Sequence, residues 1–195
     1  NGGEVRPADQ PDVRAISVLR RDFRFDPVTR AFEVISGGAR FGNTFDDWGN
    51  RFLCDIRNPA EHVVLPARYL ARNPRLAAPK ALHDAAISGD TIPMFRISPA
   101  EPWREFRARR WAAVGKVMPR SELVGAGYLT SSSGVTVYKG DAYPPAFRGQ
   151  LFLGEVANNL IHRETLEPDG VTFRARRADE KAEFVASTDT WFRPV

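Results

Sequence analysis

A strand–turn–strand pattern that occurs twice constrains the fold of this chain more than any other feature. The first copy runs from Asp22 to Ile35, where apolar and polar residues alternate on both sides of a turn at Asp26–Thr29. The second copy runs from Asn159 to Arg176, with its turn at Glu167–Gly170. Alternation with a period of two around a Pro-containing turn is typical of a β-hairpin that buries one face. The sequence therefore predicts an all-β fold.

A further β segment precedes the second hairpin. Gly134–Tyr138 and Gly149–Leu153 read as two short strands joined by a loop with Pro144 and Pro145. Together with the hairpin they make four strands in about 45 residues, which is the repeat length of one propeller blade. The same spacing suits a β-sandwich, so periodicity leaves both architectures open.

Residues 66–120 differ from the rest of the chain. They are rich in alanine and proline, and Trp103, Phe106 and Arg110 share one face of a helix that we expect to begin near Pro102. We expect one domain over residues 1–195, with a partly helical or irregular insertion at about residues 66–120.

Composition excludes several classes of protein. An apolar content of 43% is enough for a core, and a charged content of 27% does not indicate disorder. The net charge of +4 comes mainly from dispersed arginines, whereas nucleic-acid binding needs clustered positive charge. No apolar run is long enough to span a bilayer. The single cysteine, Cys54, lies in an apolar strand and is interpreted as a small buried hydrophobic residue.

Six runs of residues carry a family resemblance. They are Arg40–Asn50 (RFGNTFDDWGN), Val64–Pro66 with Tyr69–Leu70 and Arg72–Pro74, Glu101–Arg104 (EPWR), Gly134–Asp141 (GVTVYKGD), Leu166–Val171 (LEPDGV) and Ala186–Val195 (ASTDTWFRPV). In this order they resemble the N-terminal domain of the membrane-bound dehydrogenases of the Planctomycetes–Verrucomicrobia type. From Gly134 onward the chain is also similar to soluble quinoprotein glucose and sorbosone dehydrogenases.

The resemblance implies a fold and a setting for the chain. It implies an incomplete β-propeller, about half of a six-bladed one, in an exported, periplasmic protein. Members of the family often continue into helical repeats and a c-type cytochrome domain. Haem would then lie outside this chain, which has no CxxCH motif. The rest of the same polypeptide is the expected protein partner, and we expect the isolated chain to oligomerise or aggregate through its exposed edges.

The resemblance also implies pyrroloquinoline quinone and Ca²⁺ as cofactors. Asp46 and Asp47, with Asn43 and Asn50, offer oxygen atoms of the kind that Ca²⁺ prefers. In the alternative interpretation, Asp46 caps a tight turn that Gly49 completes in the left-handed conformation. We favour the turn, because Ca²⁺ needs six or more oxygen ligands and the spacing is not that of an EF-hand.

His162 is the candidate catalytic residue, as the general base that takes the proton of an alcohol while hydride leaves. Asn158 and Asn159, which precede it, and Arg193 are candidate cofactor ligands, because an arginine can pair with a carboxylate through two hydrogen bonds. Each has a structural alternative. A histidine in an alternating strand is usually packed and hydrogen-bonded, and Arg193 can stack on Trp191. The four tryptophans, Trp48, Trp103, Trp111 and Trp191, are interpreted as packing residues.

Two functions follow from these observations. The first is the propeller domain of a quinoprotein-like dehydrogenase that oxidises a carbohydrate or alcohol and passes electrons to a haem domain outside the chain. The second is a non-catalytic propeller that binds glycans or proteins. Fold resemblance alone does not decide between them.

Overall fold

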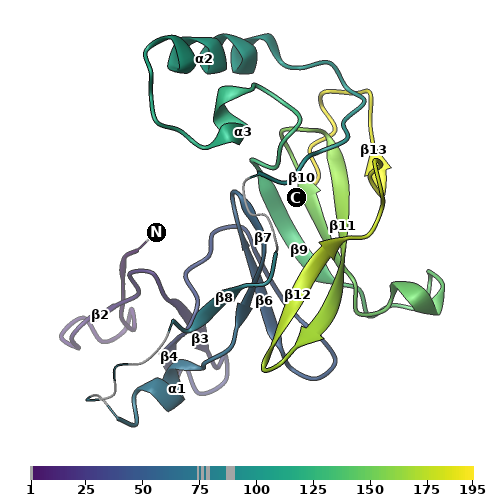
Figure 1. The fold of residues 1–195 in the computed structure, drawn as a ribbon. Coiled ribbons are helices and arrows are strands. Elements are labelled where there is room, and N and C mark those ends of the chain that lie inside the picture. Colours follow the sequence, from purple (N-terminus) through teal and green to yellow (C-terminus); the bar gives the residue numbers. More distant parts are fainter. Residues whose placement is uncertain (1, 74, 76, 78–79, 87–90) are drawn as a thin grey trace.

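Two antiparallel sheets, each built on a meander of four strands, form the centre of the molecule (Figure 1). In the computed structural model, residues 2–73, 75, 77, 80–86 and 91–195 are described. The strands of each sheet follow one another in chain order, so each sheet is a meander. The first sheet contains β5 (Gly42–Phe45), β6 (Arg51–Asp55), β7 (Asn58–Val63) and β8 (Leu82–Asp84). The second contains β9 (Ser132–Val137), β10 (Leu151–Glu155), β11 (Leu160–Asp169) and β12 (Thr172–Arg177), and β13 (Val185–Ala186) also pairs with β11.

The two sheets meet where the first strand of each lies against the other. The N–H of Gly134 donates to the carbonyl of Phe41 (2.7 Å), and the N–H of Val137 donates to Oγ1 of Thr44 (3.1 Å). A β-carbon on Gly42 would lie 2.7 Å from the backbone nitrogen of Val135, so only glycine allows this close approach.

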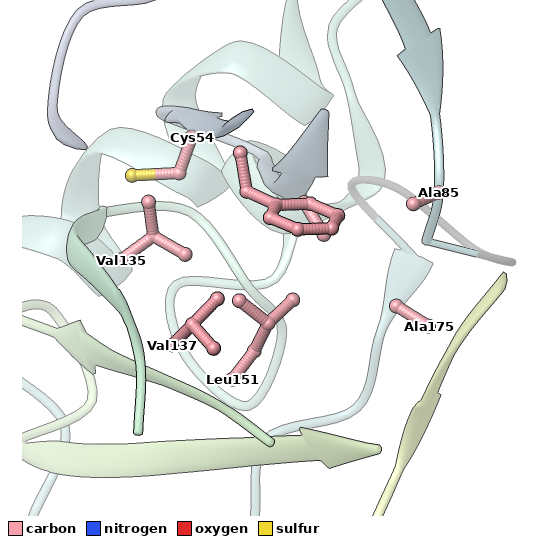
Figure 2. Close-up of a cluster of buried hydrophobic side chains, with 8 residues drawn as sticks. Cys54, Ala85, Val135, Val137, Leu151 and Ala175 are labelled. Atoms are coloured by element: carbon pink, nitrogen blue, oxygen red, sulfur yellow. The ribbon is translucent and has the colours of Figure 1, made fainter. Parts of the chain in front are cut away.

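The main core fills the space between the two sheets (Figure 2). Alternate residues of β6 and β9 point into it, as a period of two requires. Its buried members are Phe52, Cys54, Ala60 and Ala85 from the first half of the chain and Val135, Val137, Leu151 and Ala175 from the second. The expectation that Cys54 is a buried hydrophobic residue is confirmed, because none of its surface is exposed. A second cluster contains Ile92, Met94, Leu129, Leu153 and Leu160.

The segment after β8 connects the outer parts of the two sheets. The N–H of Ala175 in β12 donates to the carbonyl of Ala85 (2.7 Å), and Ala86 forms a parallel bridge with Ala175. Further along, the N–H of Leu129 donates to the carbonyl of Ile92 (2.9 Å). Residues 85–86 and 91–95 therefore lie against the second sheet.

Both predicted hairpins are present. In the first, β3 (Asp22–Phe25) pairs with β4 (Phe32–Ile35), and Oδ1 of Asp26 accepts the N–H groups of Val28 (2.8 Å) and Thr29 (3.0 Å) in the predicted turn. The second hairpin joins β11 and β12, but its predicted turn at Glu167–Gly170 is wrong. Pro168 and Asp169 pair with β12, and the connection is only Gly170 and Val171, with Gly170 at a φ of 64°.

Helices lie within residues 66–120, as predicted. They are α1 (Ala67–Leu70), α2 (Pro102–Ala113) and the first residue of α3 (Arg120–Leu123). Pro102 occupies the first turn of α2, as expected. The same range also contains β8, which belongs to the first sheet; residues 74, 76, 78–79 and 87–90 lie outside the described residues.

Helices α2 and α3 lie at one end of the sheets (Figure 1). The buried carboxylate of Glu122 in α3 attaches them. It accepts hydrogen bonds from Arg57 (2.6 Å), Arg107 (2.5 Å) and Thr130 (3.1 Å). Arg57 belongs to the first sheet's β6–β7 turn and Arg107 to α2, so one carboxylate links three parts of the chain.

The remaining elements are short. β1 (Glu4–Val5) pairs with β2 (Ile16–Ser17), and the 3₁₀ helix η2 (Pro145–Phe147) lies in the connection between β9 and β10. None of the helices in the described part of the chain is long and apolar enough to cross a membrane. The fold is mostly β, in agreement with the predicted class.

Candidate functional site

A buried cluster of charged side chains lies on the inner face of the second sheet. His162 and Glu164 are two residues apart in β11, so both point to the same face of the sheet. Nδ1 of His162 lies 2.7 Å from Oε2 of Glu183, and Nε2 lies 3.4 Å from Oε1 of Glu164. The three side chains are 1%, 3% and 0% exposed for His162, Glu164 and Glu183. Burial of three ionisable groups together requires that they pair.

Glu183 is held from several directions. It follows β12 in the chain, and its Oε1 accepts hydrogen bonds from the N–H of Phe95 (2.9 Å) and from Nη1 of Arg177 (3.0 Å). Arg177, the last residue of β12, also donates to the carbonyls of Ala182 (2.8 Å) and Pro93. Both oxygens of Glu183 are therefore used, and the ring of His162 is fixed in orientation.

The pairing shifts the pKa values of His162 and Glu183. Burial by itself lowers the pKa of His162, but the interactions with the carboxylates of Glu164 and Glu183 outweigh it, and the pKa is raised. Burial raises the pKa of Glu183, but the interaction with His162 dominates, and the pKa is lowered. A general base must be unprotonated, whereas these surroundings favour the protonated ring. The catalytic role of His162 stays a prediction.

A cavity of about 470 Å³ adjoins this cluster. Its walls combine apolar and charged residues: Ile92, Pro93, Phe95 and Ala175, and Glu164, Arg176, Arg177, Glu180 and Lys181. Oε2 of Glu164 and Nε2 of His162 have no hydrogen-bond partner among the described residues. Glu164 lines the cavity, but its unpaired Oε2 is itself buried.

Asn158 and Asn159, the candidate cofactor ligands, are buried in the turn between β10 and β11. Asn158 accepts the N–H of Gly127 (3.0 Å) and donates to the carbonyl of Tyr128 (3.0 Å) and to Glu155. Asn159 donates to the carbonyls of Thr190 (3.0 Å) and Phe192 (2.9 Å), and its Oδ1 accepts from Ser98 (2.8 Å). Both amides therefore hold neighbouring segments together.

Arg193 is likewise bonded within the chain. Its Nη1 donates to the carbonyl of Val156 (3.1 Å), and its Nη2 pairs with Oε1 of Glu101 (2.6 Å), whose Oε2 accepts from Arg104 (3.0 Å). Trp191 is 84% exposed and Trp48 is 90% exposed, so neither packs against the described part of the chain; that they pack between blades stays a prediction. Each follows an aspartate by two residues, and that aspartate's Oδ1 accepts the tryptophan N–H in a turn on the surface.

Asp46 caps the turn between β5 and β6. Its Oδ1 accepts the N–H groups of Trp48 (2.9 Å) and Asn50 (2.8 Å), and its Oδ2 accepts the side-chain amide of Asn50 (2.7 Å). Gly49 has a φ of 83°, as the turn interpretation expects. Asp47 is exposed beside it. In the described ranges of the chain, no group of three or more His, Cys, Asp or Glu side chains is arranged to hold a metal ion.

The sequence did not reveal Glu164, Glu183 or Arg177 as members of the cluster. Glu164 had a usable signal, because a second ionisable residue two positions after His162 in a strand must share its face. Glu183 had none, because it reaches His162 from a loop 21 residues along the chain.

The fold and the cluster define a mostly β protein with a buried charge network beside a cavity. The chain belongs to a family described as a Domain of unknown function (DUF7133), which matches residues 1–195. No curated protein and no solved structure matches the chain.

Proposed function

We propose that the two four-stranded sheets are neighbouring blades of a β-propeller that serves as a binding domain. A propeller consists of four-stranded antiparallel meanders arranged around an axis, with the first strands of successive blades closest to it. The order of strands in each sheet and the contact of β9 with β5 are consistent with this arrangement. The hairpin of β3 and β4 would then supply the outer strands of a preceding blade.

A repeated set of contacts is the observation that carries the propeller proposal. At the start of the second sheet, Ser132 donates its N–H to the carbonyl of Ile56 in the first sheet's β6–β7 turn (3.1 Å), and Gly134 bonds to Phe41 beside β5. After the second sheet, Arg193 donates to the carbonyl of Val156 in the corresponding β10–β11 turn. Two residues later, Val195 lies against Gly134 in β9, where a β-carbon on the glycine would be 2.6 Å from the Val195 carbonyl carbon. Residues 193–195 thus contact the same part of the second sheet that residues 132–134 contact in the first, although Arg193 does so through its side-chain Nη1 and Ser132 through its backbone N–H.

An aromatic surface covers the other face of the second sheet. It contains Tyr138, Tyr143, Phe147, Phe152 and Phe184, whose rings contact one another at centroid distances of 4.9–6.4 Å. Arg163 stacks over the ring of Phe147 at 4.5 Å. Because residues 193–195 already lie on this sheet, we propose that a further blade of the same polypeptide packs on the aromatic surface.

The residues that would hold pyrroloquinoline quinone and Ca²⁺ do not fit that role. The polar atoms of Asn158 and Asn159 are bonded within the protein, and Arg193 pairs with Glu101. Both oxygens of Asp46 are used in its own turn. We therefore derive no step through either cofactor and favour the non-catalytic binding propeller over the dehydrogenase.

The dehydrogenase remains a second candidate for one reason. A histidine whose Nδ1 is held by a carboxylate, as His162 is by Glu183, has the arrangement of a general base with its orienting group. In that proposal the protein is exported to the periplasm and passes electrons to a haem domain outside this chain.

Titration calorimetry with pyrroloquinoline quinone in the presence of Ca²⁺, followed by a dye-reduction assay with aldoses and alcohols, tests the choice between the two functions. We expect no saturable quinone binding and no dye reduction. Saturable binding together with quinone-dependent reduction that His162→Gln abolishes, in a variant that still folds, would establish the dehydrogenase instead.

The aromatic surface has its own test. We expect the isolated chain to oligomerise in light scattering and the double variant Tyr143→Ser, Phe147→Ser, which changes one exposed and one half-buried ring, to shift it toward the monomer, because accessible aromatic area drives association. Val171→Ser, which changes an 84% exposed residue in the β11–β12 turn, is the control. A wild-type chain that is monomeric at all concentrations would contradict the docking proposal.

A further inference from the structure

The outer face of helix α2 exposes large apolar side chains. The helix lies at one end of the molecule, beyond α3 (Figure 1), and its inner face is anchored because Arg107 pairs with Glu122 of α3 (2.5 Å). Trp103, Phe106 and Arg110, which the sequence placed on one helical face, are all exposed. The exposed apolar side chains of α2 and of the segment after it are Trp103 (51%), Phe106 (64%), Val114 (70%) and Val117 (97%). Apolar side chains gathered in this way mark interaction surfaces.

The same segment carries the excess positive charge of the chain. Residues 102–120 contain six arginine and lysine residues and one carboxylate, Glu105, so their net charge is +5, whereas the whole chain carries +4. Two of the six cations are neutralised, because Arg104 pairs with Glu101 (3.0 Å) and Arg107 pairs with Glu122. The charge of the chain is therefore concentrated here, although the sequence suggested dispersed arginines.

The other four cations have no carboxylate partner among the described residues. Arg109 and Arg110 are exposed, and their side chains form no hydrogen bond or ion pair with the described part of the chain. Lys116 and Arg120 stack on aromatic rings, at 5.0 Å and 4.6 Å from the ring centroids. Unpaired cations beside apolar side chains favour a partner that carries carboxylates, because complementary charges steer its approach and select it over other partners.

The mixture of charge and apolar area on this face restricts the class of partner. A helix that lies in a lipid surface separates its apolar face from its charged face, whereas Arg110 shares the face of Trp103 and Phe106. Single-stranded nucleic acids stack their bases on free aromatic rings, whereas Arg104 and Arg107 already stack on the ring of Trp103, at 4.7 Å and 5.1 Å. Tryptophan, phenylalanine and arginine side by side are the composition typical of protein–protein interfaces.

We propose that the outer face of α2 is a docking surface for an acidic segment of a partner protein. Carboxylates of that segment would pair with Arg109 and Arg110, and a neighbouring apolar side chain would pack on Phe106. The pairing of Arg107 with Glu122 already holds the helix in place, so binding does not have to order it. The surface is separate from the aromatic surface of the second sheet and does not depend on the sheets being propeller blades.

Selection of phage from a random library of short peptides, with the wild-type chain immobilised, tests the chemistry of the partner. We expect the enriched peptides to combine several aspartates or glutamates with an aromatic or aliphatic residue. One such peptide is then synthesised, and its dissociation constant is measured by fluorescence anisotropy. Enrichment of basic or uncharged peptides, or no enrichment at all, would overturn the proposal.

Charge variants locate the binding of the selected peptide. Arg109→Gln combined with Arg110→Gln should weaken it at least about tenfold, because the two unpaired cations are lost. Arg14→Gln combined with Arg21→Gln removes the same charge at exposed positions outside α2, so the affinity should stay within about twofold. Equal weakening by the two double variants would show attraction to the net charge alone and would refute the site.

An apolar variant tests the second half of the contact. Phe106→Ser should also weaken the peptide about tenfold, because an aromatic anchor is lost. Phe25→Ser, which changes a side chain that is likewise 64% exposed, is the matched control and should leave the affinity unchanged. Full affinity in a folded Phe106→Ser variant would contradict the proposal; if that variant does not fold, the charge variants decide.

Two further probes represent the other classes of partner: single-stranded oligothymidylate and phosphatidylglycerol vesicles. We expect both to bind more weakly than the selected peptide at about 0.15 M salt. Tighter binding of either probe that Arg109→Gln with Arg110→Gln abolishes would assign the surface to nucleic acid or lipid instead.

Discussion

Each of the two sheets buries one histidine on its third strand, and the pKa values of the two histidines are shifted in opposite directions. His62 in β7 faces aromatic rings, lying 5.2 Å from Phe52 and 5.1 Å from Phe173 between centroids, and its Nδ1 contacts Oγ1 of Thr172 at 3.0 Å. Burial is the main cause that lowers its pKa. His162 in β11 faces two carboxylates, and its pKa is raised. The position in the strand determines that each ring is buried, and the residues that pack against the ring determine the direction of its pKa shift.

The largest effect on stability is expected from removing Glu183, the carboxylate that bonds His162. Glu183→Ala leaves His162 and Arg177 without their shared carboxylate in a buried site, so the free energy of unfolding should fall by about 3–5 kcal/mol. Urea denaturation followed by circular dichroism measures it. Glu180→Ala, an exposed change in the same loop, is the control. A loss below about 1 kcal/mol would mean that the cluster is not energetically coupled.

The second prediction compares the last residues of the second strands, Asp55 and Glu155. Burial raises the pKa of Glu155 to about 7, although four hydrogen bonds hold its carboxylate. Glu155→Gln would turn an amide NH₂ toward N–H donors, so it should cost about 2 kcal/mol of stability. Asp55→Asn, whose side chain is 44% exposed, should cost less than about 0.5 kcal/mol. Equal losses of stability for the two variants in thermal or urea unfolding would contradict the expected difference between Glu155 and Asp55.

The pH dependence tests the two histidines directly. Because the pKa of His162 is raised by folding, its stabilising contribution is complete below its unfolded value of about 6.5 and is lost as pH rises through the folded value. Because the pKa of His62 is lowered, stability falls as pH drops below about 6.5. NMR titration of the ring Cε1 protons measures both. Equal pKa values for the two rings would contradict the opposite shifts.

The smallest effect concerns the first turn of the first sheet. Asp46→Ala removes three hydrogen bonds from an accessible turn and should lower the free energy of unfolding by about 1 kcal/mol, whereas Asp47→Ala should change little. Thermal melts with and without Ca²⁺ complete the test. A Ca²⁺-dependent rise in melting temperature that Asp46→Ala abolishes would restore the predicted calcium site.

Local patterns were readable from the sequence, and long-range partners were not. The hairpin from Asp22 to Ile35 followed from alternation and from an aspartate–proline turn, which are local signals. The second turn was misplaced because Pro168 read as a turn residue, although it lies within β11. Asn158 was predicted to be a cofactor ligand; its partners within the protein, Gly127 and Tyr128, are about 30 residues away and no local pattern specifies them.

At Trp48 and Trp191 two sequence signals predicted different environments. Large aromatic residues usually pack, so Trp48 and Trp191 were interpreted as packing residues. Each instead lies at the tip of a turn built by an aspartate two residues earlier. The aspartate indicated a surface turn and the aromatic ring indicated burial, and the structure has the hydrogen-bonded turn.

The contact between β5 and β9 has a consequence for how the chain assembles. It joins residues up to 93 positions apart, whereas the strands within each sheet are near neighbours in sequence. Each sheet can therefore form before the two meet. Until they meet, the thiol of Cys54 is accessible; afterwards it is buried against Val135, and burial raises its pKa to about 11. The reactivity of the Cys54 thiol therefore reports when the two sheets pack together. A thiol reagent applied at successive times during refolding would label only those molecules whose sheets have not yet met.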